Sequence, residues 1–247
     1  MAAAESTTIT ITKETAKRLL FDIKSIMKAQ LEEQGIYYKH SEDNILEGYA
    51  LIIGPPDSLY ENGFFIFKLK FPEDYPHSPP TLEYLTNDQV TRFHPNLYKN
   101  RRVCIDILNT WRGERWSGCQ SISSVLLTIA SLLDKSPLLH EPGVMPTHSD
   151  YEKYNRVITY KTLEFAVYAM LTNFKTHIKI EDAYSNHFYD IMKVHYRKTE
   201  KEILNKIQMQ QQLQPTSVYY TISLYDFGCK IDYTELLQNF QTIDKKE

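Results

Sequence analysis

The chain has 247 residues, of which 42% are hydrophobic and 24% are charged, which is typical of a soluble globular protein. A net charge of −3 argues against a nucleic-acid binder driven by bulk electrostatics. No apolar run approaches the ~20 residues that cross a bilayer, and three scattered cysteines make neither a disulfide framework nor a zinc site. The composition predicts a soluble protein of a reducing compartment, cytoplasmic or nuclear, with no metal and no membrane or nucleic-acid partner.

The N-terminal half is predicted to be a helix followed by strands. A flexible, Thr-rich leader, residues 1–11, precedes a helix whose N-cap is Thr12 and whose end is Gly35. Helical spacing predicts that the apolar side of this helix is formed by Ala16, Leu19, Leu20, Ile23, Met27 and Leu31. Strand patterns follow at 48–53, 64–71 and 81–85, and prolines stiffen the loop before the last of them.

The C-terminal half is predicted to be mostly helical. An amphipathic helix is marked by an apolar stripe of Ile122, Val125, Leu126, Ile129, Leu132 and Leu133. Further helical patterns cover residues 163–174 and run from Phe188 to about Gln212. Asp232 then resembles the N-cap of a last short helix.

The order of these elements indicates the fold class. Strands that come together before a run of helices are typical of an α+β fold with an antiparallel sheet. We expect residues 12–150 to form a four-stranded antiparallel meander flanked by helices. Residues 151–247 are expected to be a helical C-terminal extension that packs on this first domain.

One segment joins a rigid turn to a cysteine. His94-Pro95-Asn96 is followed by Cys104, eight residues after the asparagine. An unpaired cysteine is usually a small buried hydrophobe, but a carboxamide on the same segment can face the oxyanion that develops on a thioester. We therefore expect the Cys104 sulfur to be reachable from solvent, and to act first as nucleophile and later as leaving group.

Several blocks resemble, in order, the ubiquitin-conjugating (E2) enzymes, over residues 12 to about 150. They are residues 16–20, 53–64, 71–80 and 94–104, Trp116-Ser117, and the helix from Ile122. A narrower likeness is to class Z, the extended E2 enzymes that an alternative E1 charges. It rests on the insertion 110–115 and on residues 121–126, 140–143 and 227–233.

The family resemblance implies a function. An activating enzyme (E1) would load ubiquitin or a ubiquitin-like protein onto Cys104 as a thioester. The modifier would then pass to a lysine of a protein substrate, directly or with an E3 ligase, and no cofactor would be needed. Asn96 would donate its amide to the oxyanion or to the Cys104 loop, while His94, Pro95 and Trp116 would have structural roles.

The resemblance also places acidic groups near the cysteine, where they would orient or deprotonate the incoming lysine. By motif position Glu141 matches one such residue, and His140 is an adjacent candidate. Asp106 matches a second family carboxylate. Each of the three could instead be an ordinary surface charge.

Partner surfaces are suggested at two places. Lys13, Lys17 and Arg18 make the first helix basic, as in family members whose first helix docks on the E1, although a solvated helix face would have the same pattern. The E3-binding positions hold His77 and Ser117-Gly118 where many relatives have an aromatic residue and Ser-Pro-Ala. Engagement of common RING or HECT ligases is therefore in question.

Two other functions compete with the enzymatic one. The chain could be a non-catalytic E2-like scaffold that binds a partner E2 or ubiquitin, although such scaffolds typically lack the cysteine. It could also be a binding protein that acts mainly through the extension.

Overall fold

The computed structural model describes residues 11–243, so nearly all of the leader predicted for residues 1–11 lies outside the described part. The first domain begins with helix α1 (Lys13–Lys28) and continues into an antiparallel sheet of order β1-β2-β3-β4. The four strands are β1 (Ile36–His40), β2 (Glu47–Ile53), β3 (Phe64–Lys70) and β4 (Thr81–Tyr84). The α+β class and the four-stranded meander are confirmed. The sequence pattern had not located β1.

The first helix begins as predicted but ends earlier. The Thr15 amide donates to the Thr12 side chain over 3.1 Å, which confirms the N-cap. The helix stops at Lys28, and Gly35, with a φ of 75°, instead ends the short 3₁₀ helix η1 (Leu31–Gln34). Leu20 and Met27 were wrongly placed on the buried side, since they are 49% and 73% exposed.

The buried side of α1 is set by a seven-residue spacing. Leu19 and Ile26 are 0% and 4% exposed, and Leu20 and Met27 each lie one residue further on. One residue turns the chain by about 100° around the helix axis, which moves both side chains to the solvent side.

Both faces of the sheet are buried. Leu51, Ile66 and Phe64 lie on the face opposite to that of Ala50 and Phe65, yet all five side chains are 0% exposed. Strands covered on two sides read as continuous hydrophobic runs, as β2 and β3 do.

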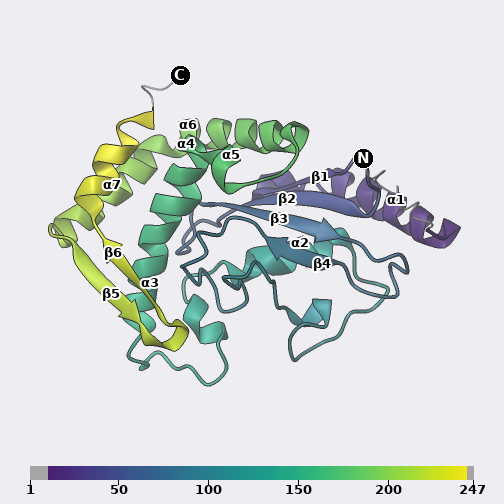
Figure 1. Cartoon of the computed structure of the whole chain (residues 1–247), viewed down its shortest axis with the longest axis horizontal. Coiled ribbons are helices and arrows are strands. Elements are labelled where there is room, and N and C mark those ends of the chain that lie inside the picture. Colours follow the sequence, from purple (N-terminus) through teal and green to yellow (C-terminus); the bar gives the residue numbers. More distant parts are fainter. Residues whose placement is uncertain (1–10, 244–247) are drawn as a thin grey trace, which may run out of the picture.

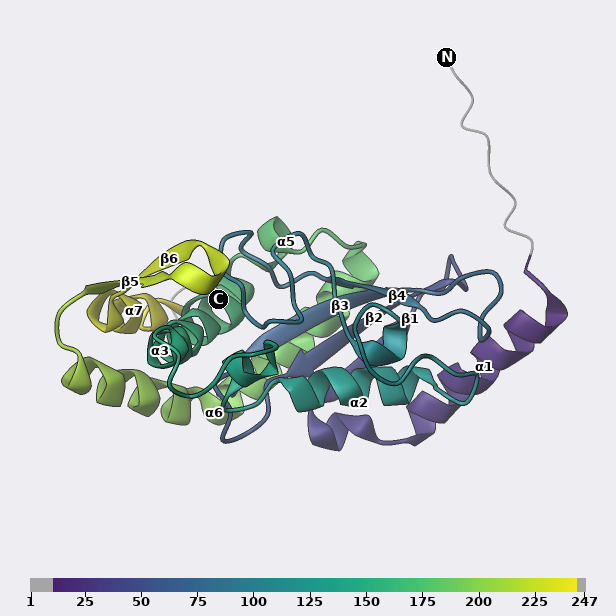
Figure 2. The ribbon, with the colours of Figure 1, turned by 90° about the horizontal axis from the view of Figure 1, so that it is seen from below.

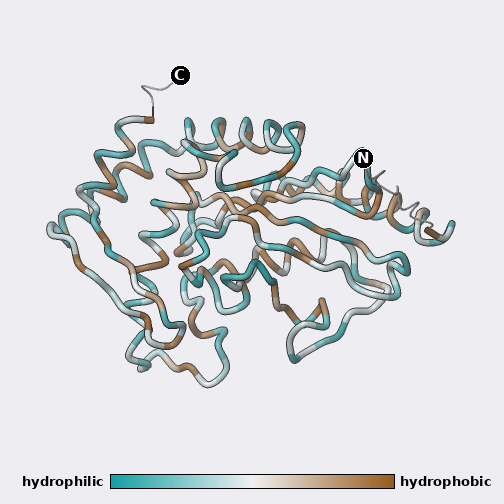
Figure 3. The backbone as a smooth tube through the Cα atoms, viewed as in Figure 1, coloured by the Kyte–Doolittle hydropathy of each residue, from teal (hydrophilic) through white to brown (hydrophobic). Residues whose placement is uncertain are grey.

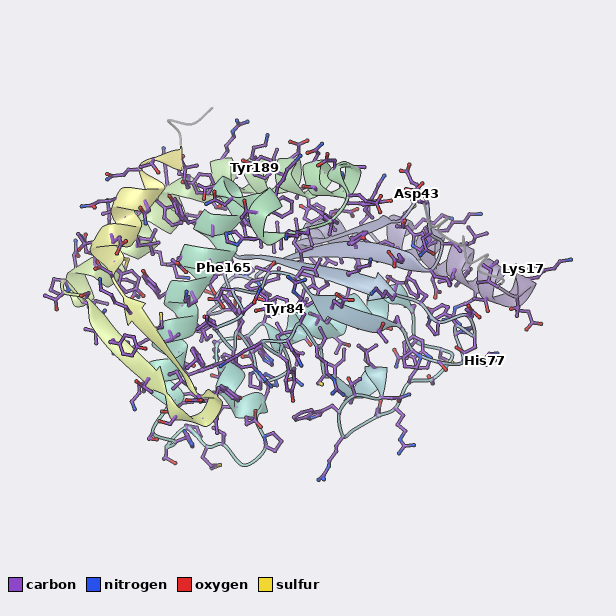
Figure 4. The ribbon with its side chains drawn as sticks, in the orientation of Figure 1. Lys17, Asp43, His77, Tyr84, Phe165 and Tyr189 are labelled. Atoms are coloured by element: carbon purple, nitrogen blue, oxygen red, sulfur yellow. The ribbon has the colours of Figure 1, made fainter. Side chains whose placement is uncertain are left out.

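The cover of the second face comes from the extension. Helix α6 (Asp182–Leu213) lies along one side of the sheet (Figure 1). Tyr184 stacks on Tyr49 with ring centroids 4.9 Å apart, and the His195 ring meets the Phe64 ring edge-on at 5.9 Å. Phe165 adds a ring contact with Phe93 near the centre of the molecule (Figure 4).

The extension is mostly helical, as predicted, but it also contains a β-hairpin. The helical run to Gln212 is confirmed by α6, and the cap of the last helix is confirmed because Asp232 accepts from the Glu235 amide over 3.1 Å. The unpredicted hairpin pairs β5 (Val218–Ile222) with β6 (Phe227–Ile231). In chain order the extension consists of α3 (Tyr151–Lys161), the π-helical segment η4 (Thr162–Ala169), α4 (Met170–Thr172), α5 (Phe174–His177), α6, β5 (Val218–Ile222), η5 (Ser223–Tyr225), β6 (Phe227–Ile231) and α7 (Tyr233–Phe240).

The molecule is elongated, with α1 at one end of its long axis and the hairpin and α7 at the other (Figures 1 and 2). Hydrophobic residues concentrate in the central strands (Figure 3). Among residues 11–243, none of the helices combines the length and the hydrophobicity that a membrane span requires. The division into domains at residues 12–150 and 151–247 stays a prediction.

Candidate active site

The motif segment lies in the long connection between β4 and helix α2 (Ile122–Leu132). His94 is fully buried, and its Nδ1 accepts from the Asn96 amide over 3.0 Å. Burial, reinforced by nearby His140 and Arg92, holds the pKa of His94 well below its usual range. The imidazole is therefore neutral, and because Nδ1 is an acceptor its proton sits on Nε2.

Asn96 and Cys104 are joined by two hydrogen bonds. The Cys104 amide donates to the Asn96 carbonyl over 2.9 Å, and the Asn96 side-chain Nδ2 donates to the Cys104 carbonyl over 2.5 Å. Both residues are buried. In this state the Asn96 amide is thus committed to the backbone of Cys104, which is the second of the two roles that the sequence left open.

The expectation that Cys104 is open to solvent is wrong for this conformation. The residue is only 3% exposed. Its neighbours Val103 and Ile105, each 2% exposed, are buried as well. The cysteine segment is therefore packed against the hydrophobic core in this conformation.

The insertion after Cys104 is tied back to the cysteine segment. The Thr110 hydroxyl accepts from the Ile105 amide and donates to the Ile105 carbonyl, both over 3.0 Å. Gly113 lies so close to Asp106 that a Cβ on it would come within 2.7 Å of the carboxylate. Asp106 Oδ1 accepts from the Ile107 amide over 2.8 Å, at the start of the 3₁₀ helix η2 (Asp106–Leu108).

An open hollow of about 710 Å³ lies beside this insertion. Its lining comes from two loops, through Asn109, Thr110, Trp111, Arg112 and Pro142. The hollow therefore connects the insertion that follows Cys104 with the loop that carries Glu141.

The two predicted acid–base candidates on that loop already have partners. His140 ends the 3₁₀ helix η3 (Pro137–His140), and its Nε2 lies 2.9 Å from Asp134 Oδ2. The His140 ring is also 5.0 Å from that of His94. Glu141 Oε2 accepts from the Tyr225 hydroxyl over 2.6 Å. His140 is thus held against the first domain, while Glu141 is held by the extension.

Three residues with polar contacts at the site were not found by the sequence patterns. Arg92 donates to the carbonyls of His94 and Pro95, and its guanidinium lies 3.3 Å from the Tyr98 ring centroid. Lys99 and Tyr225 connect the same region to the extension. Tyr225 is far from the motif in sequence, and no local pattern marks it.

The predicted E1-binding residues differ in their surroundings. Lys13 and Lys17 are exposed, and Lys17 points away from the body of the protein at the end of the long axis (Figure 4). The Arg18 side chain is only 22% exposed and pairs with Asp22, which is 1% exposed. Arg18 also donates to the carbonyls of Gly118 and Gln120. It therefore joins α1 to the 117–120 loop.

We expect Arg18→Ala and Lys17→Ala to separate stability from docking. Loss of Arg18 leaves the buried Asp22 carboxylate without its guanidinium, which costs about 3 kcal/mol and lowers the melting temperature by roughly 6–12 °C. Lys17→Ala should leave the melting temperature unchanged and slow E1-dependent charging severalfold. Thermal unfolding and initial charging rates measure the two effects. Equal melting temperatures for both variants would contradict the structural role of Arg18.

The predicted E3-binding positions come together near the same end of the molecule. His77, Ser117 and Gly118 are exposed, and His77 lies towards the α1 end (Figure 4). Trp116 is buried, and its Nε1 donates to the Pro76 carbonyl over 2.7 Å. This bond ties the proline-rich loop to the loop that follows the tryptophan.

Comparison with known proteins identifies relatives of the chain. The family model described as ubiquitin-conjugating enzyme matches residues 18–162. The chain is 42% identical over 157 residues to ubiquitin-conjugating enzyme E2 Z of Xenopus tropicalis, a match that covers 62% of this chain and 50% of that protein. The human E2 Z is 41% identical over 157 residues, with 62% and 44% covered. The predicted similarity to class Z is confirmed.

A solved structure, human ubiquitin-conjugating enzyme E2 G1, matches with a TM-score of 0.44 and 32% identity, covering 51% of this chain and 98% of that one. The chain spans half or less of the length of the E2 Z relatives that it matches. Since the family match, residues 18–162, takes in more than half of the 247 residues, the chain belongs to the ubiquitin-conjugating enzyme family.

Proposed function

We propose that the chain accepts ubiquitin or a ubiquitin-like protein from an E1 as a thioester on Cys104 and transfers it to a lysine of a substrate, directly or with an E3. In the first step the Cys104 thiolate forms a new C–S bond, and the E1 cysteine leaves. In the second, the lysine amine forms a C–N bond, the C–S bond breaks, and Cys104 leaves as thiolate. The amine proton passes to a base or to water.

The observation that carries this proposal is the pair of hydrogen bonds between Asn96 and Cys104. These bonds hold the Asn96 carboxamide against the backbone of the cysteine. The neutral His94 stabilises the same turn by accepting from the Asn96 amide. If Nδ2 moves from the Cys104 carbonyl to the thioester oxyanion, it supplies transition-state stabilisation that the ground state lacks. Because Cys104 is 3% exposed, charging also requires a change that uncovers the sulfur.

The reaction can be tested directly. The full chain is incubated with ATP, a ubiquitin-activating enzyme and ubiquitin, and separately with the alternative E1. We expect an adduct that is larger than the chain by the mass of one ubiquitin and that disappears on treatment with a reducing agent. Peptide mass spectrometry should locate the ubiquitin on Cys104. If neither E1 yields such an adduct, the proposal fails for ubiquitin, and a panel of ubiquitin-like proteins decides whether it fails altogether.

The buried cysteine favours a second candidate, the non-catalytic scaffold. A buried thiol that never becomes exposed cannot be charged, yet the surrounding fold could still bind ubiquitin or a partner E2. Under this alternative the chain would bind ubiquitin saturably but would form no covalent adduct with it. Modification of Cys104 by a small alkylating reagent under native conditions, followed by mass spectrometry, distinguishes a sulfur that opens from one that does not.

Proposed partners follow from the same function. Lys13 and Lys17 would contribute to E1 docking, because both are exposed at the α1 end. His77 and Ser117-Gly118 would face an E3. The cytoplasm or nucleus is the proposed location, since a thioester-forming cysteine works in its reduced form.

A further inference from the structure

The tip of the C-terminal hairpin, residues 223–226, is seated among residues of the candidate active site. Lys99 Nζ donates to the carbonyls of Tyr225 and Asp226 over 3.0 and 3.2 Å. The buried Asp150 Oδ2 accepts from the Leu224 amide over 2.9 Å. The backbone of the tip is therefore fixed by side chains from the first domain, including one from the segment between Asn96 and Cys104.

Tyr225 connects this tip both to Glu141 and, through Arg92, to the turn at His94 and Pro95. Its hydroxyl donates to Glu141 over 2.6 Å, and its ring lies 5.8 Å from that of Tyr154 and 5.2 Å from the Arg92 guanidinium. Arg92 in turn bonds the carbonyls of His94 and Pro95. Burial, together with Tyr154 and the bond to Glu141, raises the pKa of Tyr225, so the hydroxyl keeps its proton and acts as the donor.

We propose that Tyr225 is a positioning residue for Glu141 in the transfer of the modifier to lysine, so that the extension completes the active site of the first domain. This inference rests on the proposed function. Glu141 is half-buried and is followed by exposed Pro142 and Gly143. The Tyr225 hydroxyl holds Oε2 and leaves Oε1 to meet the lysine amine. A fixed carboxylate orients that amine without a further loss of side-chain entropy.

The geometry predicts an effect on one step only. Charging by the E1 uses the Cys104 thiolate and involves no lysine, so it does not need Glu141. Discharge to an amine does need it. Tyr225→Phe removes the hydroxyl and keeps the ring that packs on Tyr154 and Arg92. We expect it to charge at the wild-type rate and to discharge to free L-lysine about tenfold more slowly, which is the scale of a hydrogen bond to a charged group.

Coupling between variants separates positioning from a general structural role. The single variants Tyr225→Phe and Glu141→Gln and the double variant are charged with ubiquitin, and the E1 is then stopped. Single-turnover discharge is measured against L-lysine concentration. If Tyr225 acts through Glu141, the double variant discharges within about twofold of Glu141→Gln alone. Tyr220→Phe is the matched control, because its hydroxyl is on the same hairpin but bonds Gln214 over 3.2 Å, and it should behave as wild type.

Each contrary outcome has a distinct meaning. Discharge of Tyr225→Phe at the wild-type rate, or a double variant whose defect is the product of the two single defects, overturns the inference. Slower charging of Tyr225→Phe also rejects it, because the bond would then support the site as a whole. In all three cases the proposed function stands if wild type charges and discharges. If wild type never forms the adduct, the proposed function and the inference both fail.

Discussion

Cys104→Ala is expected to abolish the reductant-sensitive ubiquitin adduct while the chain stays folded. The substitution removes the only atom that forms the C–S bond, so charging should fall by at least ~10³-fold. The fold should persist because both hydrogen bonds between Asn96 and Cys104 use backbone atoms of the cysteine, which alanine keeps. Non-reducing gels measure the adduct, and thermal unfolding measures the fold.

The other two cysteines provide matched controls. Cys119 is exposed, and Cys119→Ala should charge as wild type. Cys229 is buried, and burial raises the pKa of its thiol to about 11, which leaves it almost entirely protonated at neutral pH. An adduct that survives Cys104→Ala but not Cys119→Ala would move the acceptor to the 117–119 loop and contradict the assignment.

The sequence predicted best those features that local chemistry decides. Thr12 and Asp232 were recognised as N-caps because a side-chain oxygen three residues ahead of an amide is a local signal. Gly35 was wrongly predicted to end the first helix: it ends η1, and the switch from α-helix to this 3₁₀ helix has no comparable local mark in the sequence. The exposure of Met27 depends on where α1 packs, and spacing alone does not show that.

Contacts between distant segments were harder to predict. Phe64 and Ile66 are buried because α6 covers the second face of the sheet, and α6 begins more than a hundred residues later. Their continuous hydrophobic run was a usable sign that something covers this face. The β5–β6 hairpin was missed because the region after residue 150 was interpreted as mostly helical, and no strand was assigned to it.

The candidate site shows the same division. Asn96 and Cys104 are on one short segment, so their contact could be predicted from the motif. In the sequence Arg18 is indistinguishable from the other basic residues of the first helix. Only the structure shows that it forms an ion pair with the buried Asp22. Tyr225 contacts Glu141, which is 84 residues away in the sequence, and no pattern within either segment predicts this contact.

Asn96→Asp is expected to slow the discharge of charged Cys104 by about 10²–10³-fold, the usual cost of removing one oxyanion donor. Aspartate has nearly the shape of asparagine, so the change is chiefly chemical. It replaces a donor 2.5 Å from the Cys104 carbonyl with a carboxylate oxygen, and two acceptors then face each other in a buried place. Stability should fall as well, by about 1–3 kcal/mol. Discharge to L-lysine and chemical unfolding measure the two effects.

The relation between these two losses decides which role the amide has. Asn100→Asp is the matched control, because Asn100 is exposed in the same segment and acts through its Oδ1, which accepts from the Arg102 amide and survives the change. If Asn96→Asp lowers stability but, once charged, discharges as fast as Asn100→Asp, the amide only holds the backbone of Cys104. If discharge falls even where both variants are fully folded, the amide acts in the reaction itself, beyond holding the backbone of Cys104. The hydrogen bond between Asn96 Nδ2 and the Cys104 carbonyl would then show where the amide lies before it donates to the oxyanion.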